Sequence, residues 1–176
     1  MRKTGLLWLA AVLLAIPAAA QTKVGGKIHC AKADPDSMIE VGDKPGHTLY
    51  ARKAACTWED GSQEIAGLKT KTGVDVATGE VSGTTMRDSG YHTATMDNGD
   101  KYVVRFNGAA TMAKDNSGTI DGKWSFISGT GKLKGIKGSG TYKGTANADG
   151  SADVTVDGDY TLAAKTTAPA ATTKKK

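Results

Sequence analysis

The chain has 176 residues, of which 39% are hydrophobic, 23% charged and 6% aromatic. These fractions are typical of a globular protein and exclude a disordered one, and the length suits a single domain. Glycine is frequent, at 23 residues, but it follows no three-residue period and only four prolines accompany it. This composition excludes collagen and favours a turn-rich, all-β chain.

The first twenty residues have the organisation of a secretory signal peptide. Arg2 and Lys3 precede the apolar run 6–16, and small residues follow it up to Ala20. The run is short for a bilayer span, and its small-residue end fits a cleavage site. We therefore expect cleavage before Gln21, export to the periplasm or the medium, and no transmembrane segment in the mature chain. The alternative interpretation is an uncleaved membrane anchor.

Basic and acidic residues balance once the two ends of the chain are set aside. Removing the two basic residues of the leader from the 23 Lys and Arg leaves 21, against 18 Asp and Glu. Three of those 21 are Lys174, Lys175 and Lys176, so the body carries 18 of each sign. The excess positive charge does not indicate a nucleic-acid-binding surface, and we expect no nucleic-acid partner.

Cys30 and Cys56 are the two cysteines of the chain. In an exported protein an even number of cysteines favours a disulfide over a metal pair or a nucleophile. We expect a Cys30–Cys56 bridge, which would fasten the N-terminal segment to the body and stabilise the fold by about 3–4 kcal/mol. A reactive thiol is the alternative, and it needs a basic neighbour such as His29.

The first part of the mature chain predicts less structure than the second. Segment 21–46 mixes short apolar stretches with Gly and Pro turns, which predicts an extended N-terminal segment with loops. Segment 47–58 contains neither Gly nor Pro and fits a strand or a short helix. Segment 63–71 is the other candidate helix, although Gly67 interrupts it.

From Val74 to Leu162 the hydrophobic pattern has a period of two, interrupted by turn dipeptides such as Asn98-Gly99 and Asp149-Gly150. Such a pattern predicts an antiparallel meander with one buried face. About eight strands within 47–162 would hide their edges best as a closed, calycin-like barrel. The remainder, 163–176, lacks large apolar residues and is expected to be a flexible tail.

The alternation places several aromatic residues inside this barrel. A barrel of about eight strands either fills with side chains or holds one small apolar ligand. Glycines on the same face, Gly122, Gly140, Gly144 and Gly158, would leave room for a ligand. The predicted ligand-binding residues are Tyr102, Phe106, Trp124, Phe126, Tyr142 and Tyr160.

Familiar cofactor and metal motifs are absent from the sequence. Lys132 follows a Gly-Thr-Gly turn but precedes Leu133, so the turn is not a phosphate-binding loop, and no dinucleotide fingerprint joins a strand to a helix. His29, His47 and His92 lack zinc-ligand spacing. The acidic turns lack the twelve-residue calcium pattern. We expect no cofactor and no metal.

Catalytic signals are weak. The sequence contains no Gly-x-Ser-x-Gly elbow, which argues against a serine hydrolase. Glu80, Arg87 and Asp88 lie near His92 on expected neighbouring strands, where they are either a polar group inside the barrel, suited to acid–base chemistry, or solvated strand residues. Arg52 is a further candidate on a strand whose inward face the pattern does not settle.

The stretch 124–142 resembles the late strands of allene oxide cyclase-like and dirigent-like barrels, where a Gly-Thr-Gly turn, a basic residue and a second glycine-rich turn join two strands. The resemblance extends over about 91–162 and points to a small exported bacterial branch of that superfamily. It implies the barrel fold and, by analogy, cyclisation of a fatty-acid epoxide or steering of phenoxy-radical coupling. The matching residues are Gly129, Thr130, Gly131, Lys132, Leu133, Gly135, Gly138 and Gly140.

Two functions follow from these observations. The neutral body, the apolar interior and the lack of a catalytic motif favour an exported, non-catalytic barrel that binds a small apolar ligand. A cyclase or isomerase of the allene oxide cyclase type is the alternative, and it would need a polar group inside the barrel to stabilise developing charge. The feature that separates the two is whether an ionised side chain faces the lumen. The oligomeric state is left open.

Overall fold

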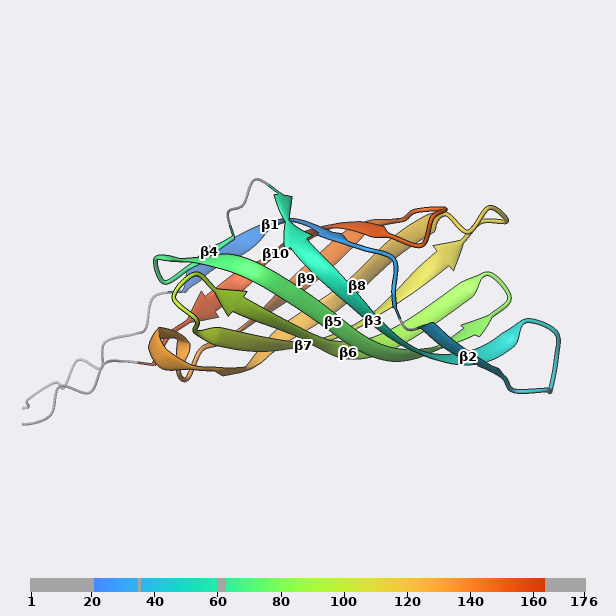
Figure 1. The fold of residues 1–176 in the computed structure, drawn as a ribbon, viewed down its shortest axis with the longest axis horizontal. Helices are drawn as coiled ribbons and strands as arrows, with labels where there is room; N and C mark the ends of the chain where they lie inside the picture. Colours follow the sequence, from blue (N-terminus) through green and yellow to red (C-terminus); the bar gives the residue numbers. More distant parts are fainter. Residues whose placement is uncertain (1–20, 35, 60–62, 164–176) are drawn as a thin grey trace, which may run out of the picture.

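The structure is a computed structural model that describes residues 21–34, 36–59 and 63–163. Within this part of the chain, eight antiparallel strands close into a barrel, in the order β1-β10-β9-β8-β7-β6-β5-β3 and back to β1 (Figure 1). The eight are β1 (Thr22–Cys30), β3 (His47–Trp58), β5 (Leu68–Ser82), β6 (Thr85–Met96), β7 (Lys101–Met112), β8 (Gly118–Gly129), β9 (Lys137–Ala146) and β10 (Ala152–Thr161). The closed, all-β barrel predicted from the sequence is confirmed.

Two short strands lie beside the barrel wall. β2 (Asp36–Glu40) pairs with the first part of β3, and β4 (Glu64–Ile65) forms a small hairpin with β5. A 3-10 turn, Gly131–Leu133, follows β8. The predicted N-terminal segment thus supplies β1 to the wall, so residues before 47 also build the barrel.

The seam between β1 and β3 has the shortest run of paired residues in the barrel wall. Ile28, His29 and Cys30 pair with Trp58, Thr57 and Cys56, and beyond this point β3 pairs with β2 instead. A disulfide joins Cys30 to Cys56 across the seam, as predicted. The bridge therefore fastens the strand pair that closes the sheet on itself.

The turn residues act as the sequence indicated. Gly99 and Gly150 have φ angles of 87° and 88°, and Asn116 has a φ of 66°, which permits tight reversals between strands. Segment 47–58 is a strand. Segment 63–71, the other candidate helix, is instead the β4–β5 hairpin, because Ala66 and Gly67 both take positive φ and reverse the chain there.

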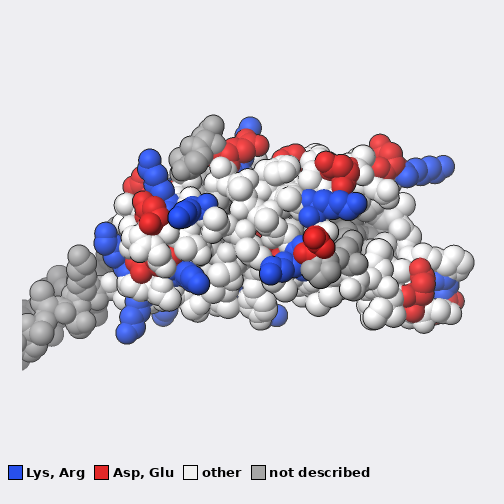
Figure 2. Space-filling view, viewed as in Figure 1, with Lys and Arg blue, Asp and Glu red and all other residues white. Residues whose placement is uncertain are grey.

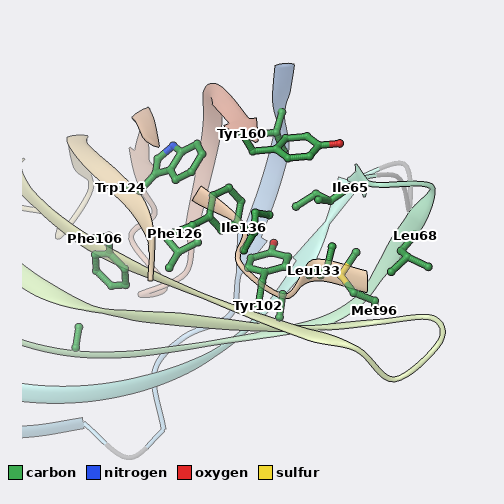
Figure 3. Packing of buried hydrophobic residues seen from close by; sticks show 14 residues of the cluster. Ile65, Leu68, Met96, Tyr102, Phe106, Trp124, Phe126, Leu133, Ile136 and Tyr160 are labelled. Atoms are coloured by element: carbon green, nitrogen blue, oxygen red, sulfur yellow. The ribbon is translucent and has the colours of Figure 1, made fainter. Parts of the chain in front are cut away.

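The predicted inward face is observed on β7 and β8, where Tyr102, Phe106, Trp124 and Phe126 are buried. Tyr160 of β10 is buried in the same cluster. At one end of the barrel this cluster is dense, and Figure 3 shows side chains from several elements meeting there. The largest fully enclosed members are Ile65, Met96, Leu133 and Tyr102. We call this region the filled end, and the opposite region, where β2 lies, the open end.

The outside of the barrel is polar and mixed in sign. Figure 2 shows acidic and basic side chains interspersed on the face in view, without a large area of one sign. This agrees with the balanced charge of the chain body. No helix in the described ranges has the length and apolar character to cross a membrane. The predicted signal peptide and most of the predicted tail lie outside the described residues.

A polar and aromatic cavity in the open half of the barrel

A cavity of about 310 Å³ occupies the open half of the barrel lumen. Gln63 and Tyr102 line it toward the filled end, and their side chains are joined by a hydrogen bond of 2.5 Å from the Tyr102 hydroxyl to Gln63 Oε1. At the other end the lining includes Asn116 and Asn147, which belong to the β7–β8 and β9–β10 turns. The cavity therefore runs from the core of the barrel to its open end.

Aromatic rings form one wall of the cavity. Phe126 lies between Tyr102 and Trp124, with edge-to-face contacts at ring-centroid distances of 5.3 and 5.2 Å. Five of the six aromatic residues predicted from the sequence line the cavity; the sixth, Tyr160, does not. Its hydroxyl accepts a hydrogen bond of 3.1 Å from the Ala66 amide and belongs to the filled end.

Inward-facing glycines give these rings the space they occupy. A Cβ atom on Gly122 would lie 2.2 Å from the Tyr142 ring, and one on Gly158 would lie 2.4 Å from the Trp124 ring. Gly108 and Gly140 are close to the same two rings. The expectation that the glycines leave room for a ligand thus holds only in part, because ring atoms fill the space beside Gly122, Gly140 and Gly158.

The opposite wall, from β3, β5 and β6, carries charged side chains. Arg52 donates a hydrogen bond of 2.6 Å to Asp88, with side-chain exposures of 25% and 14%. Burial opposes the charge on the guanidinium, but the hydrogen bond and charge of Asp88 outweigh it and raise the pKa of Arg52. Both side chains line the cavity, so an ion pair faces the lumen.

A second polar pair lies beside the first. His92 Nδ1 and Asp75 Oδ1 are 2.6 Å apart, and both residues line the cavity. His92 Nε2 is buried without a hydrogen-bond partner and lies against Gly73, where a Cβ would be 3.0 Å away. A carboxylate on one ring nitrogen fixes the orientation of the imidazole, as in many acid–base sites.

Two tyrosine hydroxyls lie near these charges. Burial raises the pKa of Tyr50, and the charge of Asp88 raises it further; the pKa of Tyr142 is raised for the same two reasons. The Tyr50 hydroxyl is buried with no hydrogen-bond partner. Both phenols therefore stay protonated in ordinary buffers, available as hydrogen-bond donors rather than as bases.

The sequence pattern predicted only some of the residues of this charged wall. Arg52, Asp88 and His92 face the lumen as the acid–base alternative required, whereas Glu80 and Arg87 point outward and are exposed. Asp75 was missed. The Gly83-Thr84 turn could have indicated it. If Ser82 pairs with Thr85 across that turn, the same register along the two strands places Asp75 opposite His92.

The arrangement combines an apolar aromatic wall with a charged wall across one cavity. It can bind a ligand whose body is apolar and whose polar group meets Arg52, Asp75 or Asp88. It can also hold or move a proton, because a carboxylate–imidazole pair and a carboxylate–guanidinium pair lie on the same wall. Among the described residues, Asp75, Cys30 and Cys56 are the one group of His, Cys, Asp or Glu side chains close enough to share a metal ion, and both cysteines are engaged in the disulfide.

Comparisons with known proteins found no matching family model and no matching curated protein. Two solved structures are similar to the chain at 16% identity, the pterocarpan synthase dirigent proteins GePTS1 and PsPTS1. The first has a TM-score of 0.48 and covers 89% of this chain and 99% of its own; the second has 0.47, 81% and 96%. Both are dirigent proteins, the kind of barrel that the 124–142 pattern resembles. At these scores the likeness assigns neither ligand nor activity to this chain.

Proposed function

We propose that this protein is an exported barrel that binds one small ligand in its lumen without transforming it. The observation that supports the proposal is the pairing of an aromatic wall with a charged wall around a cavity of about 310 Å³. The volume lies at the lower end of the usual range for ligand pockets, roughly 300–1,000 Å³. A compact molecule with a mainly apolar body and one polar group fits this description.

The polar group of the ligand is expected to meet the Arg52 side. Arg52 Nε is buried without a hydrogen-bond partner, and a buried polar group left in this state costs about 1–3 kcal/mol. A ligand oxygen near the guanidinium would recover part of that cost. The aromatic wall would hold the apolar body through surface burial.

Native mass spectrometry of the protein purified from its own host tests the proposal. We expect a co-purifying small molecule that is lost in Trp124→Ala, which removes part of the aromatic wall, and kept in Tyr91→Ala, which removes an exposed ring outside the barrel. Thermal unfolding of both variants checks that each is folded. An empty wild-type protein that also fails to bind apolar fluorescent probes would leave a purely structural role.

Export is part of the proposal and has its own test. A chain that starts at Gln21 and carries the Cys30–Cys56 bridge is the expected mature form in the periplasm or the medium. Intact-mass measurement of each cell fraction, with and without reductant and thiol alkylation, reports both features. Full-length protein retained in the membrane would indicate an uncleaved anchor instead.

A second candidate function is acid–base conversion of the bound ligand, as in a cyclase or isomerase of the allene oxide cyclase type. It is favoured by one observation: Arg52, Asp75, Asp88 and His92 all face the lumen. Conversion of an unsaturated epoxide by the wild type and Arg87→Gln, but not by Arg52→Gln, would establish it, because Arg87 is the exposed, outward counterpart on β6. Equal, background-level turnover by all three proteins would leave binding as the function.

A further inference from the structure

The disulfide has an unusual neighbour inside the barrel. Cys30 lines the cavity, and its Sγ atom lies 3.8 Å from Asp75 Oδ2. Both sulfur atoms and a carboxylate oxygen of Asp75 lie within 4.8 Å of one another. The other oxygen of Asp75 is held by His92 at 2.6 Å. Two sulfurs, a carboxylate and an imidazole thus form a continuous chain.

Fastening the seam does not require a carboxylate beside the bridge, and the pair with His92 engages only the Oδ1 atom of Asp75. A disulfide sulfur carries no proton, so it gives Asp75 Oδ2 no hydrogen bond, and the side chain of Asp75 is only 16% exposed. A thiol at the same place donates a hydrogen bond to the carboxylate, and a departing thiolate can take up a proton that the carboxyl group has accepted. The Asp75 carboxylate is therefore placed for the reduced state and for the steps that lead to it.

We propose that Cys30–Cys56 is a redox-active disulfide that exchanges with small thiols entering the cavity, with Asp75 as the group that carries the proton. This proposal does not rest on the proposed storage of an apolar ligand, although a stored ligand would occupy the same cavity and slow the entry of a thiol.

The exchange balances without any further oxidant or reductant. Asp75 takes the proton of an entering thiol, and the thiolate attacks Cys30 Sγ, the sulfur that lines the cavity. The Cys30–Cys56 bond breaks, a mixed disulfide forms at Cys30, and Asp75 returns the proton to the departing Cys56 thiolate. A second thiol attacks the mixed disulfide, leaves as a small-molecule disulfide and gives its proton to Cys30. Two thiols are oxidised and one protein disulfide is reduced.

The partner is a small thiol rather than a protein. Cys30 and Cys56 are 7% and 2% exposed, and the lumen that leads to Cys30 has a volume of only about 310 Å³. A cysteine on a folded protein cannot enter such a space, whereas a low-molecular-weight thiol with an apolar body matches both its size and its aromatic wall.

The test measures how fast the bridge of the folded, oxidised chain from Gln21 is reduced by 2-mercaptoethanol, with acid quenching, alkylation and mass analysis. We expect a rate that rises in proportion to thiol concentration. Asp75→Asn, which keeps the size of the side chain, should slow it about tenfold or more. Asp157→Asn, an exposed carboxylate on β10, is the matched control and should keep the wild-type rate.

A second measurement separates access through the cavity from unfolding. A thiol attached to a large polymer should reduce the native bridge far more slowly than free 2-mercaptoethanol, although both should reduce the urea-unfolded chain at similar rates. The proposal is overturned if the native rate is independent of thiol concentration, if free and polymer-bound thiols act equally, or if Asp75→Asn reacts as fast as the wild type. Urea unfolding of each variant confirms that a slow or fast rate reflects the site and not the fold.

Discussion

The filled end and the open end of the barrel are built from the same strands, yet their interiors are occupied differently. At the filled end, the β4–β5 hairpin and the Gly131–Leu133 turn supply Ile65 and Leu133, which are fully buried among apolar neighbours. At the open end, no such plug is present in the described residues, and the same strands carry Arg52, Asp88 and Asp75 inward. The filled end is therefore a packed core, whereas the open end holds a cavity with charged side chains in its lining.

The largest expected difference between the two ends appears when the same side chain is shortened in each. Ile65→Ala at the filled end should lower the free energy of unfolding by about 2–5 kcal/mol, because a tightly packed site loses contacts and cannot collapse. Ile120→Ala at the open end should cost about 1 kcal/mol, because Ile120 is only partly buried and already borders the cavity. Urea unfolding at equilibrium measures both. Equal losses would mean that the open end is as closely packed as the filled one.

A smaller effect concerns the glycines of the open half. Gly122→Ala should cost about 1–3 kcal/mol, because the added methyl group would lie within 2.2 Å of the Tyr142 ring and 2.5 Å of the Asn107 carbonyl oxygen. In a Tyr142→Ala background the cost should fall, since the ring no longer competes for the space. A double-mutant cycle by urea unfolding gives the coupling energy. A coupling near zero would show that Gly122 is required by the backbone alone.

The barrel was predictable because the turn dipeptides and the alternation of apolar and polar residues indicate the same strands. Asn98-Gly99 and Asp149-Gly150 mark hairpins, and Tyr102, Phe106, Trp124 and Phe126 repeat with the period of a strand that has one buried face. Local and global signals are consistent over this half of the chain, which is what allows a pattern to specify a fold. The disulfide was predictable from the count of cysteines and the expected compartment.

The charged wall was not predictable from the alternation of apolar and polar residues, because in β5 a polar residue faces inward and an apolar residue faces outward. Val76 is 51% exposed on the outside, paired with the exposed Tyr91, while Asp75 between Val74 and Val76 faces the lumen. A bulge between Thr70 and Thr72 shifts the phase of the same strand. Polar-in and apolar-out order is the reverse of what hydrophobic burial favours, and such departures are expected where a strand serves a site rather than the core.

The smallest predicted effect lies at the open end, where His47 links the β2–β3 loop to β5. His47 Nδ1 is 2.5 Å from Asp43 Oδ1, and Nε2 is 2.6 Å from Glu80 Oε1. The hydrogen bond to Asp43, followed by the one to Glu80, raises the pKa of His47. Since the folded pKa is raised, the stabilisation is complete below the unfolded value of about 6.5 and disappears as pH rises through the folded pKa.

Glu80→Gln should therefore lower the midpoint of the His47 titration and narrow this pH window, as followed by NMR of the imidazole ring protons. The signals of His29 and His92 serve as internal references, because neither ring contacts Glu80 in the described residues; an unchanged His47 midpoint would show that Asp43 alone holds the imidazolium.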